Sequence, residues 1–132
     1  MYVLIDMSEQ DLIRLSLFNE VEVYTREFSE RNRELLFCID SFLRETGVQK
    51  DVLRGIGVVV GSGSFTSTRI AVTMANTFGY ALNIPLLAIK KEELGSLPSL
   101  LKRIQAQPVG QYISATYSGE PNVGSQNKEI EK

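Results

Sequence analysis

The sequence contains no histidine, and its only cysteine is Cys38. Without histidine, the chain has no imidazole to activate a nucleophile, carry a proton or bind a metal ion. A single cysteine can form neither an intramolecular disulfide nor a cysteine pair for zinc. Cys38 lies in an apolar stretch between Leu35 and Phe42, where we expect a buried, unreactive thiol. Most familiar hydrolase mechanisms are therefore excluded.

The chain also lacks an excess of positive charge and a long hydrophobic run. Its 14 lysines and arginines against 16 acidic residues give a net charge of -2. General binding to nucleic-acid phosphates needs a surplus of cations, which is missing here. No apolar run approaches the ~20 residues of a membrane span, and the N-terminus has no basic segment or cleavage site typical of a signal peptide. We therefore expect a cytoplasmic protein without membrane contact.

The length of 132 residues suits one domain, and 43% hydrophobic residues are ordinary for a folded protein. A chain of this size buries roughly two-thirds of its unfolded surface, so it needs no disulfide or metal to fold. We expect a folded domain over residues 1–110 and a partly flexible tail over 111–132. Within the tail, residues 112–117 can add a short edge strand, and we expect mobility from Ser118 onward.

The first third of the sequence predicts three short strands. Residues 1–6 are nearly all apolar and end at Asp6. Apolar and polar residues alternate over 13–17, which is typical of a half-buried strand. In the next strand we expect Val21 and Val23 to face the core. Together these strands form an antiparallel meander.

After the meander, the apolar residues recur with a helical period, so we expect helices that alternate with further strands. In the first helix, Ser29 is the expected cap and Gly47 the expected end. Its apolar stripe is formed by Leu35, Leu36, Ile39, Phe42 and Leu43. The expected helices span about residues 31–45, 69–82 and 94–104, and the expected strands span 55–60 and 84–89.

The element order βββαβαβα predicts an α/β fold with a mixed five-stranded sheet and helices on its faces. The β-branched run at 55–60 suits the central parallel strand, which is covered on both faces. This is the ribonuclease H-like unit, the half-domain of the actin, hexokinase and Hsp70 group. No internal repeat is visible, so we expect one such unit.

The loop over residues 61–69 lies between a buried strand and a helix, where backbone N–H groups and the helix dipole can hold an anion. It lacks the Gly-Lys-Ser/Thr end of a Walker loop. A tight turn followed by an ordinary capped helix explains the same residues. Both interpretations stay open. The candidate anion or nucleotide ligands are Asp6, Gly61, Gly63, Ser64 and Thr66.

Asp6 belongs to this set because the first and fourth strands are neighbours in the predicted topology. In actin-like ATPases a carboxylate at this place holds the metal ion of the nucleotide. One carboxylate alone makes a poor Mg²⁺ site, however, because the ion is normally shared between protein and phosphates. Asp6 can equally accept hydrogen bonds from the turn at 7–10, and we favour that alternative.

The second helix carries small residues at four-residue intervals, at Ala71, Ala75 and Gly79. Such a stripe lets another helix approach closely. No charged residue occurs between Arg69 and Lys90. An uncharged helix in a small domain is either fully buried or part of an interface, and we favour the interface.

Three segments of the chain resemble TsaB, a subunit of tRNA threonylcarbamoyladenosine biosynthesis. Residues 61–71, Gly-Ser-Gly-Ser-Phe-Thr-Ser-Thr-Arg-Ile-Ala, resemble the family pattern Gly-Pro-Gly-Ser-Phe-Thr-Gly-Leu-Arg-Ile-Gly. Residues 4–8, Leu-Ile-Asp-Met-Ser, resemble its Ile-Asp-Thr-Ser start, and residues 29–31 match the Ser-Glu-Arg that opens its first helix. The chain departs from the pattern at Ser62, where the family has proline, and at residues 67–68.

The resemblance implies a non-catalytic partner of TsaD, which transfers a threonylcarbamoyl group to adenosine 37 of tRNAs that read ANN codons. TsaD holds a metal partly through two histidines of its first helix, and residues 28–34 contain none. In the family, the two helices after the meander form the dimer interface. Here that implies an interface of Arg31, Leu35, Phe65, Arg69, Ala71, Met74, Ala75, Phe78 and Gly79.

The implied partners are a TsaD-like subunit, a TsaE-like ATPase and, when the chain is alone, a second copy of itself. The tRNA is contacted only indirectly. Family members have a second lobe after the Ile-Pro strand, and we expect this chain to have only the first lobe. No cofactor is therefore expected on this chain alone, and ATP would act at the level of the complex. Two alternatives remain: a nucleotide-binding actin-like half-domain, and a homodimeric structural paralogue without a tRNA role.

Overall fold

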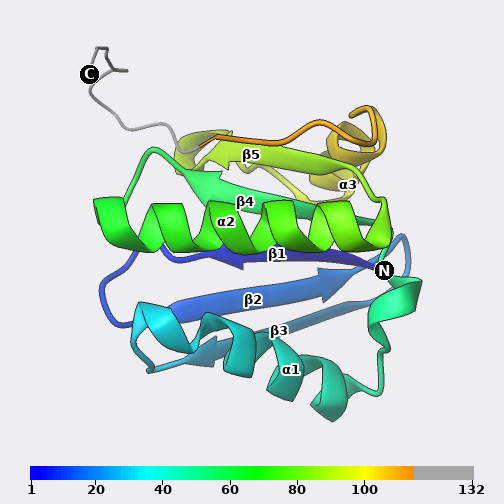
Figure 1. Cartoon of the computed structure of the whole chain (residues 1–132). Coiled ribbons are helices and arrows are strands. Elements are labelled where there is room, and N and C mark those ends of the chain that lie inside the picture. The colour runs from blue at the N-terminus through cyan, green and yellow to red at the C-terminus, as the bar shows by residue number, and fades with distance from the viewer. Residues whose placement is uncertain (115–132) are drawn as a thin grey trace, which may run out of the picture.

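The computed structural model describes residues 1–114, in which a mixed five-stranded sheet carries helices on both faces (Figure 1). The strand order is β3-β2-β1-β4-β5. β1 pairs antiparallel with β2, and β2 with β3, whereas β1–β4 and β4–β5 are parallel. The predicted α/β sheet is thereby confirmed. The strands are β1 (Tyr2–Asp6), β2 (Ile13–Phe18), β3 (Val23–Phe28), β4 (Gly55–Val60) and β5 (Leu86–Lys90).

The helices divide the core into two layers (Figure 1). α1 (Leu35–Thr46) and α2 (Phe65–Leu82) cover one face, and α3 (Leu97–Gln105) covers the other. Every residue of β4 is buried, which explains its continuous apolar run. Three short 3-10 turns complete the described elements: η1 (Asn32–Glu34), η2 (Lys50–Val52) and η3 (Lys91–Glu93).

The ends of the helices follow local sequence signals only in part. Gly47 ends α1 in a left-handed conformation, with φ of 73°, as predicted. Ser29 does not cap this helix, because the 3-10 turn η1 separates it from the first residue of α1. α2 begins at Phe65, four residues earlier than expected, because Ser64 Oγ accepts a hydrogen bond from the Ser67 amide at 3.0 Å.

Two predictions about the core are wrong. Val21 is 89% exposed because it lies in the turn between β2 and β3, outside the strand in which it was expected. Val23 is 54% exposed because β3 is the outer strand of the sheet and α3 packs mainly on β4 and β5. Leu36 is 45% exposed, since it lies at the margin of the apolar stripe of α1 and turns away from the sheet. Cys38 is fully buried, as predicted.

After α3 the chain returns to the face that carries α2. The side chain of Asn76 pairs with the backbone of Ile113 through two hydrogen bonds: Nδ2 donates to the Ile113 carbonyl, and the Ile113 amide donates to Oδ1, each at 2.9 Å. Ile113 also packs against the core beneath α2, beyond the expected domain boundary at residue 110. Residues 112–114 form no strand, and the rest of the predicted edge strand and tail lies outside the described residues.

Candidate functional site

The carboxyl ends of three parallel strands meet at one edge of the sheet. β1 ends at Asp6, β4 leads into Gly61, and β5 leads into Lys91. In open α/β sheets this edge is where ligands bind. The predicted anion or nucleotide ligands are therefore brought together by the topology.

Two glycines shape the loop between β4 and α2. Gly61 and Gly63 have φ values of 81° and 83°, which side-chain-bearing residues rarely adopt. A Cβ atom on Gly63 would lie only 2.8 Å from Ser8 Cα and 2.9 Å from the Ser8 carbonyl oxygen. The loop therefore packs backbone to backbone against the turn between β1 and β2.

The hydroxyl groups of this loop are largely engaged within the chain. Ser64 caps α2, and Ser67 Oγ accepts a hydrogen bond from Asn32 Nδ2 at 3.2 Å. Thr68 is buried and donates to the Ser62 carbonyl at 3.4 Å. Thr66, by contrast, is exposed. The capped-helix interpretation thus describes the local geometry of the loop.

A hollow of ≈ 500 Å³ lies between this loop and the turn after β1. Its lining contains the carboxylates of Glu9 and Asp11 and, among the described residues, no lysine or arginine. Negative charge beside the start of α2 opposes the attraction of the helix dipole for an anion. Nucleotide binding here stays a prediction that these charges disfavour.

Asp6 is buried, with 4% of its surface exposed, and both of its carboxylate oxygens accept hydrogen bonds. Oδ1 accepts from the Ser8 amide at 3.0 Å and from Ser8 Oγ at 2.6 Å. Oδ2 accepts from Lys91 Nζ at 2.6 Å and from Arg14 Nη1 at 3.3 Å. Burial alone would raise the pKa of Asp6, but the hydrogen bonds from Lys91 and Ser8 outweigh it and hold the pKa below its usual value.

This arrangement does not fit the metal ion that an actin-like nucleotide site would place beside Asp6. Two cationic side chains already lie on Oδ2, where a divalent ion would have to bind. Over residues 1–114 no three carboxylate or cysteine side chains converge as a metal site. The structure instead realises the alternative in which Asp6 accepts hydrogen bonds from the following turn.

Lys91 and Arg14 are the residues at this edge that the sequence interpretation missed. Lys91 is the first residue of η3, and its ammonium reaches across to Asp6 and Ser8. Arg14 joins Asp6 to Glu27 and Glu9, at 2.7 Å and 3.3 Å from these two carboxylates. The available signal for Lys91 was its position directly after the last parallel strand.

The small-residue stripe of α2 faces the chain's own sheet. Ala71, Ala75 and Gly79 are buried, and a Cβ atom on Gly79 would lie 2.7 Å from the Leu86 side chain. The stripe lets the helix lie close to the sheet, so these three residues are not available to a partner. Leu35 is likewise buried in the core. These four assignments to the interface are therefore corrected.

The other predicted interface residues are accessible to different degrees. Arg31, Phe65 and Arg69 are exposed, and Met74 and Phe78 are partly buried. The Arg69 guanidinium stacks over the Phe65 ring at 5.0 Å from its centroid. We use the name outer helical face for seven of the exposed side chains of α1 and α2, namely Leu36, Phe37, Phe65, Arg69, Thr73, Thr77 and Tyr80.

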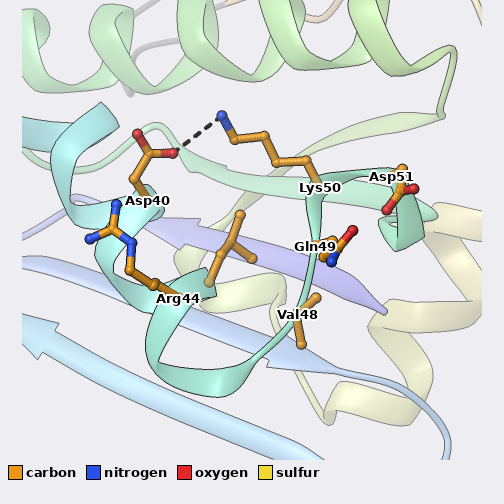
Figure 2. Close-up of a pocket in the computed structure, with 7 residues that line it drawn as sticks. Asp40, Arg44, Val48, Gln49, Lys50 and Asp51 are labelled. Atoms are coloured by element: carbon orange, nitrogen blue, oxygen red, sulfur yellow. Dashed lines mark ion pairs between the residues drawn. The ribbon is translucent and has the colours of Figure 1, made fainter.

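Lys50 links the second half of α1 to α2. Figure 2 shows it extending toward Asp40, and the two charged groups lie 3.2 Å apart. Lys50 Nζ also lies 5.7 Å from the centre of the Phe78 ring on α2. Beneath this pair is an open hollow of ≈ 430 Å³, floored by Leu43 and Val48. The ion pair thus ties the loop after α1 back to that helix.

Cys38 offers no reactive thiol. Its side chain is fully buried, and burial, helped by Glu30 and Glu34, raises the pKa of the thiol to about 11. In the described part of the chain, no helix is both long enough and apolar enough to span a membrane.

A family model described as TsaD, tRNA N6-adenosine threonylcarbamoyltransferase, matches residues 23–118. Among solved structures, YeaZ from Pseudomonas aeruginosa matches at 26% identity and a TM-score of 0.62. An uncharacterized protein with similarity to peptidase YEAZ from Pseudomonas aeruginosa matches at 25% identity and 0.61. Both matches cover 67% of this chain but only 42% of the solved chain. No curated protein matches the sequence significantly.

Proposed function

The chain belongs to the family described as TsaD, tRNA N6-adenosine threonylcarbamoyltransferase, and it is similar to YeaZ. On this basis we propose that it is a TsaB-like protein with the following function. It acts as a non-catalytic scaffold subunit in the biosynthesis of threonylcarbamoyladenosine at position 37 of tRNA. It pairs with a TsaD-like transferase through the outer helical face. The chain spans 42% of the length of the two YeaZ-like structures.

The observation that carries the proposal is the composition of the outer helical face. Phe37 and Tyr80 are 61% and 78% exposed, and Phe65 is 56% exposed. Arg69 is the only charged residue of α2. Aromatic and arginine side chains are enriched in protein interfaces, whereas lysines and carboxylates are depleted there. An outward-facing helix of this composition favours a protein partner over solvent.

The absence of catalysis is supported by residue chemistry. The chain has no histidine for a metal or for nucleophile activation, and its one thiol is buried. Asp6 is held as an ion-paired carboxylate rather than as a general acid, since its pKa lies below the usual value. These features favour a support role, and they give no basis for carrying the word peptidase from the YeaZ-like structure to this chain.

The remaining partners follow from the same role. A TsaE-like ATPase and ATP act at the level of the complex, and tRNA is held by the partner, because a net charge of -2 offers little attraction for phosphate. Without its partner the chain uses the outer helical face to form a homodimer. We propose that the chain and these partners act in the cytoplasm.

The first test is size-exclusion chromatography with light scattering on the chain alone and mixed with the TsaD-like protein of the same organism. We expect a homodimer that converts into a one-to-one heterodimer. Thr73→Arg places a charge on the exposed centre of α2 and should abolish both species while the monomer stays folded. Ser99→Arg, on the exposed side of α3, is the matched control and should leave pairing unchanged.

A homodimer that ignores the TsaD-like protein would contradict the scaffold role and favour the homodimeric paralogue. Depletion of the gene followed by nucleoside analysis of tRNA separates the two: loss of threonylcarbamoyladenosine supports the proposal, and unchanged levels reject it. Calorimetry with Mg-ATP on the chain alone should give no heat, and saturable binding would instead favour the nucleotide-binding alternative.

A further inference from the structure

The edge formed by the ends of β1, β4 and β5 contains an oxygen pair of the kind that a hard cation binds. Asp6 Oδ2 and Ser8 Oγ both lie beside Lys91 Nζ, at 2.6 Å and 3.0 Å. Carboxylate and hydroxyl oxygens at the carboxyl edge of a parallel sheet are suitable ligands for Mg²⁺. In this chain, however, an ammonium group bridges them.

We propose that Lys91 is a resident cation: its ammonium occupies the position of a divalent ion between Asp6 and Ser8, and so closes this edge of the sheet to metal ions. The inference is independent of the proposed scaffold function, since it concerns only this edge. It assigns Lys91 a positioning role, in which a covalently attached charge replaces a ligand that would have to be bound from solution.

The contacts of Lys91 differ from those of a surface ion pair. Exposed ion pairs contribute little, because both groups remain solvated. Here Asp6 is 4% exposed, and Lys91 reaches it from 85 residues further along the chain. Through Ser8, the same ammonium also contacts the turn against which Gly63 packs. One charge therefore joins β5, the turn after β1 and, at one remove, the loop before α2.

Arg14 strengthens the exclusion of a metal ion. Its guanidinium lies 3.3 Å from the same Asp6 oxygen that Lys91 contacts. Glu27 and Glu9 hold Arg14 in place, so that it cannot move away without breaking two further ion pairs. A divalent ion on Asp6 Oδ2 would thus lie next to two positive groups, and like charges at such distances repel strongly.

The test uses Mn²⁺ as a paramagnetic probe of the cation position, read from the amide signals of the ¹⁵N-labelled full chain. In the native chain we expect submillimolar Mn²⁺ to leave the Asp6, Ser8 and Gly63 signals unaffected. Lys91→Met keeps the aliphatic stem but removes the charge, and these three signals should then selectively lose intensity. Adding Asp6→Asn to Lys91→Met should abolish that loss, which separates Asp6 from the nearby surface carboxylates of Glu9 and Asp11.

Two outcomes would overturn the inference. Selective broadening of Asp6 and Ser8 in the native chain would mean that a metal ion binds despite Lys91. No broadening in folded Lys91→Met would mean that the ammonium does not stand in a cation position. The dispersion of the spectrum reports folding in every sample, and the native-chain measurement decides the first point even if the variant does not fold.

Discussion

The carboxyl edge of the sheet and the outer helical face differ in the kind of side chain they carry and in how far those side chains are buried. At the edge, buried polar atoms contact one another: Asp6 alone accepts four hydrogen bonds from Ser8, Lys91 and Arg14. On the outer helical face, large apolar groups such as Phe37 and Tyr80 lie exposed. A saturated polar cluster has little left to offer a ligand, whereas exposed aromatic groups gain free energy on burial.

The comparison teaches that a position typical of ligand binding is not itself evidence of a ligand. The edge has the topology of a binding site, but its charges neutralise one another. The outer helical face lies away from that edge, with an open hollow of ≈ 310 Å³ lined by Phe65, Arg69 and Thr73, yet its side chains are those that protein partners bury. The two regions therefore predict opposite responses to substitution: losses of stability at the edge and losses of association on the outer helical face.

The largest expected effect comes from Ala75→Arg, because Ala75 lies on the side of α2 that faces the sheet. Ala75 is fully buried against the sheet, so an arginine would bring an unpaired charge into the core. We expect a loss on the order of 4 kcal/mol in the free energy of unfolding. Thr73→Arg, two residues away and exposed, should change it by less than about 0.5 kcal/mol. Urea unfolding of both variants measures the difference, and similar stabilities would mean that the orientation of α2 described above is wrong.

Gly63→Ala should have the next largest effect, because the substitution would both strain the backbone and create a steric clash. Its φ of 83° disfavours any side chain, and the new Cβ would collide with the Ser8 backbone. We expect a loss of about 3 kcal/mol. Gly47→Ala is the matched control, since its φ is 73° but nothing lies within 4 Å of the new atom. That variant should lose only about 1 kcal/mol. Equal losses in thermal or urea unfolding would show that the loop does not press against the turn.

The edge should also impose a pH dependence with a defined sign. The pKa of Asp6 is lower in the folded chain than the value near 3.9 expected when it is unfolded. Its ion pair therefore stabilises the fold fully above that unfolded value, and this contribution is lost as the pH falls through the folded-state pKa. Asp6→Asn should cost about 2 kcal/mol at neutral pH, with a smaller cost in acid. A cost that stays constant between pH 7 and pH 3 would contradict the pairing with Lys91.

Much of the fold could be predicted from the sequence because it depends on local patterns. The alternation over residues 13–17, the apolar run of β4 and the glycine at position 47 each determine an element directly. Patterns were less informative about neighbours. The alternation at Val21 and Val23 predicts a strand, but it does not reveal that the strand begins only at Val23 and lies at the edge of the sheet, where one face remains uncovered.

The site was harder to predict for the same reason. Asp6 and Gly63 could be placed together, since parallel neighbouring strands bring their carboxyl ends to one edge. The position of Lys91 directly after β5 indicates the same edge, but its pairing with Asp6, 85 residues away in the chain, leaves no periodic trace in the sequence. The spacing of Ala71 and Ala75 correctly indicates close packing on one side of α2. It does not say whether the close neighbour is a partner helix or the chain's own sheet.

The smallest expected effect concerns Asn76 of α2. Like Asp6 at the edge of the sheet, its side chain has hydrogen-bond partners within the chain. Its amide makes two hydrogen bonds to the backbone of Ile113, so Asn76→Ala leaves that amide and carbonyl without their partner. At roughly 0.5–1.5 kcal/mol for each bond, we expect a loss of about 1–2 kcal/mol. Thr77→Ala, at the next position, removes only a bond to the Thr73 carbonyl of its own helix and should cost less than about 0.5 kcal/mol. Hydrogen exchange at the Ile113 amide gives the sharper readout: it should accelerate in Asn76→Ala and not in Thr77→Ala, and equal rates would place the end of the described chain away from α2.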